Sequence, residues 1–519
     1  MFKKIILAAA LGFFAITPVE AQTTTNEIRA LTLEEAIDLA LRHNLDVQIE
    51  RVNPEIARFN LKSIYGDYDP VFSLQLEQRY SQSPGRFDPN FGFVGGNETW
   101  VETVQPGLSG TLPTGLRYGI GGDLANRSSG NSSSIGSSVT TNGMIVTTNN
   151  FVQTIDRGTQ YNPSVGIDLA QPLLRNFWID GTRQRILVNK NTLRITEMGV
   201  RNRVMDIVTR VEQAYYDLIF QRENVRVQEK GVELAERLLS ENKRRVEVGA
   251  LAPLDEKQAE SQAAGSRADL LTAKQNLQAQ ENVLKNLITD DYVKWHNISI
   301  LPMEKLIALP EKFNLVESWQ RGMTQRPDLL QTRLDIERRD ILLRYQRNQL
   351  FPQLDLIGSY GRNGLGQHWN DALTDIRDET NPRFSYGILF SIPLSNRGPK
   401  NLYRATQAEK EQALLGLKQL EQNIMVQIDD AVKLAQTSFQ RVDATRQARI
   451  YSETALDAEQ KKLENGKSTS FVVLQLQRDL TVARSEEIRA LADYNKALAQ
   501  LAFNEGSVFE RNKLAVEVK

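Results

Sequence analysis

Residues 204–246 read VMDIVTRVEQAYYDLIFQRENVRVQEKGVELAERLLSENKRRV, and an apolar residue recurs at every seventh position. The series is Val204, Val211, Leu218, Val225, Val232, Leu239 and Val246. A strict spacing of seven is typical of a helix that packs along a coiled-coil seam. We therefore predict one helix over residues 183–247, about 100 Å long at 1.5 Å per residue. Few compact globular folds could hold such a helix.

This helix is predicted to end at Gly249, because glycine is favoured just past the end of a helix. A return helix over residues 254–289 keeps apolar residues at the same spacing. Gly466 similarly ends a second long helix, predicted over 400–464, and its return helix covers 471–505. Two helix hairpins with narrow Ala/Leu/Val seams result. Their charged outer faces are interpreted as solvated.

The two hairpins belong to an internal duplication. The segment LEEA beginning at Leu33 matches LVES beginning at Leu315, and NLDV beginning at Asn44 matches RPDL beginning at Arg326, without a gap. The predicted parts are a first repeat over 22–289, a connector of the equatorial region over 290–311, a second repeat over 312–505 and a C-terminal tail over 506–519. This organisation differs from that of a catalytic domain with an accessory domain.

The first 21 residues are predicted to be a signal peptide. Lys3 and Lys4 precede an apolar run, and small or compact residues at Val19 and Ala21 fit the cleavage site. The alternative is a retained membrane anchor, but the run is shorter than the roughly 20 residues that a spanning helix needs. We expect the mature chain to begin at Gln22 and to be exported.

Each repeat also contains two runs of alternating apolar and polar residues, and one predicted helix precedes the first run of each repeat. The predicted strands cover 71–80, 162–171, 353–362 and 384–392, and the predicted helices cover 32–65 and 313–349. Strands of this length cross an outer membrane when tilted, with one face toward lipid and the other toward a wet lumen. A soluble sandwich has the same alternation, but the export signal and the long helices favour a membrane barrel.

The first repeat carries an insertion within residues 81–160. Residues 100–111 and 116–124 flank the turn LPTG and predict an added β-hairpin. Residues 128–150 are mostly Ser, Thr, Asn and Gly. That composition cannot bury a core, so it predicts a mobile exposed loop.

Composition excludes several classes of protein. The 519 residues include 63 Lys+Arg against 64 Asp+Glu, so no basic excess points to a nucleic-acid partner. The absence of cysteine excludes disulfides, thiolate metal sites, a Cys nucleophile and a Cys-linked lipid. Hydrophobic residues at 40% and aromatic residues at 7% favour a long, thin, solvated architecture over a thick-cored enzyme.

No motif supports an enzyme, a cofactor or a metal site. The three histidines, at 43, 296 and 368, are isolated from one another in sequence. GKST beginning at Gly466 resembles the end of a phosphate-binding loop, but Lys461 replaces the glycine that the motif needs five residues earlier. We interpret this segment as a hairpin turn.

Several motifs resemble those of the TolC-like outer-membrane efflux protein family. They are LTLEEAI from Leu31, NL from Asn44, QPLL from Gln171, VG from Val248 with Asp255, and ENGKSTS from Glu464 with LQLQRDL from Leu474. The resemblance covers essentially the whole mature chain. It implies a mixed α+β membrane protein in which three copies form one outer-membrane β-barrel, continued by a long periplasmic α-helical coiled-coil barrel.

The resemblance also implies function and partners. The chain would be the passive exit duct of a tripartite efflux or type I secretion system, working with a periplasmic adaptor (membrane fusion) protein and an inner-membrane pump such as an RND or ABC transporter. The candidate tip, gate and adaptor-contact residues are Gly249, Ala250, Asp255, Gly466, Lys467, Ser468, Thr469 and Gln475. Opening would be an iris-like shift of the two hairpin ends.

Two departures from the family pattern leave alternatives open. Acidic residues close the pore of TolC in its second-copy turn, whereas this chain has Val472 and Gln475 there and keeps only Asp255 in the first copy. The inserted hairpin either enlarges the barrel from four strands per protomer to six or folds outside it as a cap. The alternative function is a periplasmic adaptor or a structural coiled-coil surface protein without a pore. No residue identifies the cargo.

Overall fold

A computed structural model describes residues 27–514 apart from 125, 143–144, 157 and 250. The predicted signal peptide lies outside the described residues. The fold is mixed α and β with a helical majority. It divides into a helical unit, residues 27–48, 204–318 and 428–514, and a sheet unit, residues 49–203 and 319–427.

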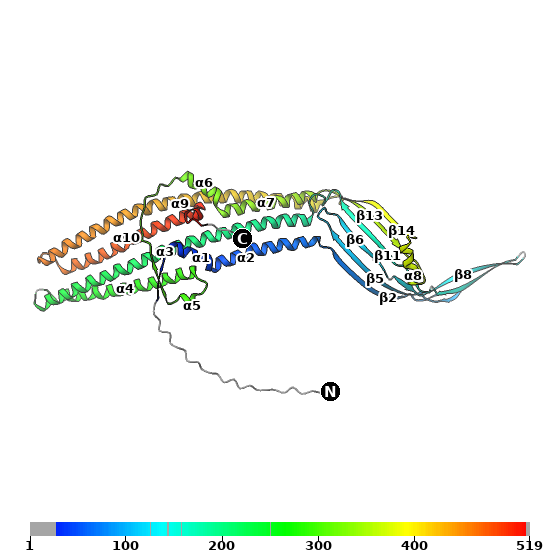
Figure 1. Cartoon of the computed structure of the whole chain (residues 1–519), viewed down its shortest axis with the longest axis horizontal. Coiled ribbons are helices and arrows are strands. Elements are labelled where there is room, and N and C mark those ends of the chain that lie inside the picture. Colours follow the sequence, from blue (N-terminus) through cyan, green and yellow to red (C-terminus); the bar gives the residue numbers. More distant parts are fainter. Residues whose placement is uncertain (1–26, 125, 143–144, 157, 250, 515–519) are drawn as a thin grey trace, which may run out of the picture. The chain divides into compact units, whose positions relative to one another are not determined.

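Two antiparallel helix hairpins form most of the helical unit (Figure 1). Helix α3 (Gly181–Glu247) is followed by α4 (Pro253–Ile288), and α9 (Arg397–Glu464) by α10 (Ser470–Glu505). Helices α3 and α9 begin in the sheet unit and continue without a break. Their bounds lie within three residues of those predicted from heptad spacing.

The predicted seam is buried over only part of its length. Val204, Val211, Leu218 and Val225 are buried, whereas Val232, Leu239 and Val246 are partly exposed. The buried row continues instead through Ala235, Leu238 and Asn242. A helix of 3.6 residues per turn drifts by about 20° per heptad against a repeat of seven, so the buried face moves to neighbouring positions along a long helix.

Both helices that precede the strands are divided, where the sequence predicted one continuous helix. The first gives α1 (Leu33–His43) and α2 (Leu45–Tyr65), with Asn44 extended between them. The second gives α6 (Leu315–Gln325) and α7 (Pro327–Asn348). Arg326 is extended because a following proline disfavours the helical conformation of the residue before it.

The connector forms structure that sequence periodicity missed. It contains α5 (Tyr292–Trp295) and β12 (Ile298–Pro302), and β12 pairs in parallel with β1 (Glu27–Leu31). The hydroxyl of Tyr215 on α3 donates to the Leu31 carbonyl at 2.9 Å. Near the C-terminus, α11 (Val508–Arg511) follows α10, and Asn512 donates to the buried Glu212 carboxylate at 2.7 Å.

The sheet unit contains one antiparallel sheet with six long strands in the order β2, β5, β6, β11, β13, β14 (Figure 1). Their bounds are β2 Val71–Gln82, β5 Glu98–Thr111, β6 Arg117–Asp123, β11 Ser164–Pro172, β13 Gln353–Asn363 and β14 Pro382–Ser391. The short strands β7 (Arg127–Ser129) and β10 (Gln160–Tyr161) extend it. The predicted hairpin corresponds to β5 and β6, which lie between β2 and β11.

The prediction of a mobile loop for the Ser- and Asn-rich segment was wrong. Its described residues pair as a two-stranded ribbon, β8 (Asn131–Asn142) with β9 (Ile145–Asp156). Ser and Thr side chains tolerate the extended backbone, and ladder hydrogen bonds do not require an apolar core. Smaller elements of the unit are η1 (Gly66–Tyr68), β3 (Arg86–Asp88), β4 (Gly92–Val94) and α8 (Trp369–Arg377). No helix among the described residues is long and apolar enough to cross a membrane.

Candidate functional site: the hairpin ends

The candidate site comprises the two turns that join α3 to α4 and α9 to α10, with the first turns of α4 and α10; we call these segments the hairpin ends. Gly249 and Gly466 have φ values of +77° and +68°, in the left-handed region. The Gly466 N–H donates to the Leu463 carbonyl at 3.1 Å, and the Lys467 N–H donates to the Lys462 carbonyl at 2.8 Å. These bonds satisfy the last carbonyls of α9, so each glycine stops a helix and turns the chain back.

Polar side chains fix the two turns from within. The Asp255 carboxylate accepts a hydrogen bond from the Ala252 N–H at 3.2 Å and thereby caps the start of α4. In the other turn, the Ser468 hydroxyl donates to the Glu459 carboxylate at 2.5 Å. Hydrogen bonds from Lys462 and Ser468 hold the pKa of Glu459 below its ordinary value. Each turn is therefore held by a carboxylate of its own hairpin.

A buried polar contact joins the two hairpins. The Ser470 hydroxyl, at the first residue of α10, donates to the Asn242 side-chain oxygen on α3 at 2.9 Å. Ser470 is fully buried and Asn242 is 1% exposed. The Asn242 amide also lies 3.5 Å from the Asp255 carbonyl oxygen. Asn242 thus links three of the four helices at this end.

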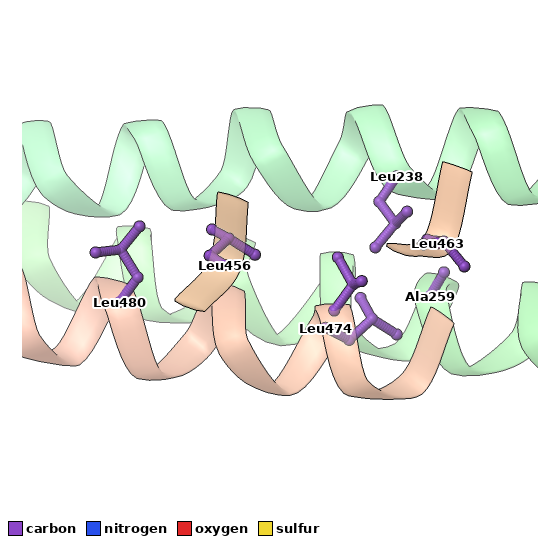
Figure 2. Close-up of a cluster of buried hydrophobic side chains, with 7 residues drawn as sticks. Leu238, Ala259, Leu456, Leu463, Leu474 and Leu480 are labelled. Atoms are coloured by element: carbon purple, nitrogen blue, oxygen red, sulfur yellow. The ribbon is translucent and has the colours of Figure 1, made fainter. Parts of the chain in front are cut away.

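An apolar cluster packs beside this contact and draws on all four helices. It comprises Leu238, Ala259, Leu456, Leu463, Val473, Leu474 and Leu480. Figure 2 shows their side chains converging between the ribbons of the two hairpins. Fully burying one such aliphatic side chain stabilises packing by about 1.5–3 kcal/mol. The hairpin ends are therefore held together chiefly by apolar packing, with Asn242 and Ser470 as the buried polar pair.

The same ion pair occurs once in each hairpin. Arg267 on α4 lies 2.7 Å from Glu236 on α3, and Arg484 on α10 lies 2.6 Å from Glu453 on α9. Each residue of the second pair is 217 positions after its counterpart, which is the offset that relates the two repeats in this region. Partly exposed pairs of this kind contribute only about 0–1 kcal/mol. These ion pairs are therefore evidence of the duplication and contribute little to the stability of the hairpins.

The structure places the predicted site residues in the two turns at one end of the helical unit. Gly249 and Asp255 lie in the first turn, and Gly466, Lys467, Ser468 and Thr469 in the second. Gln475 is exposed on α10. Ala250 lies outside the described residues. Sequence reasoning missed Asn242 and Ser470, although a polar residue in the buried row of Ala235 and Leu238 was a usable signal.

Apolar side chains are also exposed at the hairpin ends. Val248 is 79% exposed, Leu254 65% and Phe471 56%. Val472, where the family pattern has an acidic residue, lies next to Phe471 and is 36% exposed. A concentration of exposed apolar groups in these two short segments indicates an interaction surface.

Among the described residues, no group of three His, Cys, Asp or Glu side chains could hold a metal ion. His43 lies 3.2 Å from Asp290 in an exposed pair, and His296 contacts a backbone carbonyl of its own turn. Neither contact brings two histidines together.

The family model described as outer membrane efflux protein matches residues 126–289 and 320–507. The outer membrane protein TolC of Vibrio cholerae is 23% identical over 359 residues, which cover 68% of this chain and 78% of TolC. The cobalt-zinc-cadmium resistance protein CzcC of Cupriavidus metallidurans is 27% identical over 308 residues, 58% of this chain and 67% of CzcC.

Solved structures share the fold. The CmeC outer membrane channel of Campylobacter jejuni superposes with a TM-score of 0.63 at 15% identity, covering 92% of this chain and 85% of CmeC. The open state of the MtrE outer membrane channel of Neisseria gonorrhoeae gives a TM-score of 0.59 at 14% identity and covers 99% of each chain.

Proposed function

The chain belongs to the outer membrane efflux protein family, as its motifs predicted, and we propose that three copies of it form the exit duct of a tripartite pump. As a family member it is an outer-membrane efflux protein with a periplasmic helical part. In the proposed assembly the sheet units close into one β-barrel and the helix hairpins close into a coiled-coil tunnel. The duct would perform no chemical step and would conduct cargo passively.

One observation carries this proposal. A single duplicated chain combines two long helix hairpins with strands whose apolar side chains are exposed, among them Phe72, Leu74, Tyr386 and Ile388. Such a strand face is costly in water and favourable in lipid. A periplasmic adaptor or a surface coiled-coil protein has no use for these strands, so the alternative function is not supported.

We place the docking surface for a periplasmic adaptor at the hairpin ends. Val248, Leu254 and Phe471 offer exposed apolar area there, and Lys467 and Gln475 are exposed polar residues of the same segments. A central apolar group within a polar rim is the usual composition of a specific protein interface. The adaptor would in turn connect the duct to an inner-membrane pump.

Closure of the duct would rest on neutral contacts. Asp255 caps its own helix through the Ala252 N–H, and the second-copy turn has Val472 and Gln475 in place of acidic residues. The Asn242–Ser470 hydrogen bond and the apolar cluster beside it are the contacts that an iris-like opening would have to rearrange.

Fractionation and export assays test the proposal together. The protein should stay in the outer-membrane fraction after a high-salt wash, and its deletion should sensitise cells to some members of a panel of toxic compounds. Cobalt, zinc and cadmium belong on that panel because of the CzcC relative. Release of folded protein by salt would refute the membrane duct.

An adaptor-docking variant completes the test. Phe471→Asp should abolish co-purification of the adaptor while leaving the trimer in the outer membrane. Leu271→Asp is a matched control, because Leu271 is 69% exposed on α4, sixteen residues beyond Asp255. Equal loss of docking by both variants would place the adaptor elsewhere.

A further inference from the structure

We propose that the β5–β6 hairpin is part of the lipid-facing wall, so that each copy contributes six strands to the barrel and the trimer has eighteen. This inference rests on the proposed trimeric duct. The hairpin belongs to the insertion in the first repeat and has no counterpart in the second. Its place in the sheet, its side-chain pattern and its strand directions carry the argument.

The first observation is hydrogen bonding. Strand β5 pairs with β2 over twelve consecutive residues, from Val71 with Ser109 to Gln82 with Glu98. Strand β6 pairs with β11 over seven residues, from Ser164 with Asp123 to Ala170 with Arg117. The hairpin is thus inserted between two strands that the duplication assigns to the basic unit. Folding it outside the barrel would break both ladders.

The second observation is a row of apolar residues that crosses all six strands on one face; on β2 and β5, Gln78 opposite Glu102 separates this row from Tyr80 and Trp100. The registers place Tyr80 opposite Trp100, Phe72 opposite Leu108, Leu108 opposite Ile120, and Ile120 opposite Ile167; Ile167 faces Tyr360, and Tyr360 faces Phe384. Every one of these side chains is at least one third exposed. The rings of Tyr80 and Trp100 also contact each other, with centroids 4.5 Å apart and planes tilted by 41°.

The opposite face of the added hairpin consists of polar or small residues. It presents Thr99, Thr103, Gln105, Gly107, Ser109, Arg117, Gly119, Gly121 and Asp123, with Val101 as the apolar exception. A hollow along β2, β5, β6 and β11 is lined by Gln75, Gln105 and Asp168 of this face and also by Leu74, Leu108 and Ile120. A polar inner face of this kind suits a barrel wall around a wet lumen.

The third observation concerns closure between copies. Neighbouring strands are antiparallel throughout, so the last of six, β14, runs opposite to the first, β2. Each of these two strands has one long partner among the described residues and one free edge. An edge strand of ten or twelve residues invites pairing with another chain. Antiparallel pairing of β14 with β2 of the next copy would close the ring.

The consequence is a wider exit. Four strands per copy would give twelve in a trimer, and six give eighteen. Because barrel diameter grows roughly in proportion to strand number, the lumen would be about 1.5-fold wider. Barrels of 16–18 strands leave an open aqueous channel. The barrel would then restrict bulky cargo less than a twelve-stranded one.

Adjacent residues on opposite faces give a matched test. The chain has no cysteine, so single cysteines can carry a spin label without background. Ile120→Cys and Leu108→Cys lie on the apolar face, and Gly119→Cys and Ser109→Cys lie on the polar face directly beside them. A side chain at Gly119 meets no atom within 4 Å.

In trimers reconstituted into phospholipid vesicles, labels at Ile120 and Leu108 should be accessible to oxygen and inaccessible to a water-soluble nickel chelate. Labels at Gly119 and Ser109 should show the reverse. Access of the chelate to all four labels would overturn the inference, because the hairpin would then lie outside the membrane. If salt releases the protein, the proposed duct itself fails, and this inference fails with it.

Counting strands provides a second readout that does not depend on labelling. Electron cryomicroscopy of the wild-type trimer should show eighteen strands. Removal of residues 83–163 with a short glycine linker leaves β2 and β11 antiparallel and able to pair directly, so that variant should show twelve. Twelve strands in the wild-type trimer would refute the proposal while leaving the duct function intact.

Discussion

The hydrogen bond between Ser470 and Asn242 should set how tightly the hairpin ends hold together. Ser470→Ala removes a donor 2.9 Å from an oxygen of Asn242, which is 1% exposed. Leaving a buried acceptor without its donor costs about 1–3 kcal/mol, equivalent to about 5–150-fold in an equilibrium. If the ends separate when the duct opens, the open state should become more populated by that factor.

Single-channel recording in planar lipid bilayers measures this population directly. Ser468→Ala is the matched control, since it makes the same chemical change but removes a bond within one hairpin. We expect a higher open probability for Ser470→Ala and an unchanged one for Ser468→Ala. Equal behaviour of the two variants would refute the idea that Ser470 holds the hairpins together.

A double variant separates the lost bond from the unsatisfied oxygen. Asn242→Leu replaces the amide with an apolar group of similar size, so Asn242→Leu with Ser470→Ala leaves neither member of this pair unsatisfied, although it also removes the 3.5 Å contact of the Asn242 amide with the Asp255 carbonyl. Its open probability should lie between those of the parent and Ser470→Ala, because replacing both partners of a buried hydrogen bond costs less than replacing one. Additive effects of the two substitutions would contradict this reasoning.

Three further predictions concern stability and assembly. Gly466→Ala should destabilise the second hairpin by about 1–2 kcal/mol, because a side chain is disfavoured at φ +68°. Gly416→Ala lies inside α9 with open space around it and should instead stabilise the protein by about 0.5–1 kcal/mol. Chemical denaturation in detergent measures the free energy of unfolding of both variants, and changes of the same sign would contradict the prediction. Val225→Asp buries an unpaired charge and should weaken trimer assembly more than Leu239→Asp, whose site is partly exposed. Native gel electrophoresis measures the trimer, and a normal trimer of Val225→Asp would count against the seam. Burial raises the pKa of Glu212, against the opposing effects of Arg511 and Asn512. Stability from this group is present below the ordinary glutamate pKa of 4.5 and is lost as pH rises through the raised pKa. Below pH 4.5, the Glu212→Gln variant should therefore have the same melting temperature as the parent. At a pH above the raised pKa of Glu212, its melting temperature should be higher than that of the parent. A lower melting temperature of the variant at neutral pH would show that pairing of Glu212 with Arg511 dominates.

Local periodicity was enough to predict the main elements. The long helices follow from heptad spacing, because a seam that packs along one line must repeat near every 3.5 residues. The four strands of the duplicated unit follow from alternation, since a sheet with one apolar face repeats every two residues. Gly249 and Gly466 were predictable as helix ends because each adopts a positive φ, which glycine does at least cost.

Contacts between distant segments could not be predicted in the same way. Strands β1 and β12 are five residues each, and their parallel pairing joins positions 271 residues apart. Toward the hairpin end, the buried face of α3 passes through Ala235, Leu238 and Asn242 and no longer through the predicted heptad positions. The Ser- and Asn-rich insertion was predicted as a loop because composition reports burial, whereas β8 and β9 are held by backbone ladders.

The sequence by itself determined the duplication, the two hairpins, the alternating strands and the family, because each is written in local spacing or in motifs. Only the tertiary structure decided that β5 and β6 lie between β2 and β11 with one apolar face in register. It also decided that Ser470 reaches Asn242 across the hairpins. Both results depend on which distant backbones lie next to each other, and a repeat of two or seven residues carries no information about that.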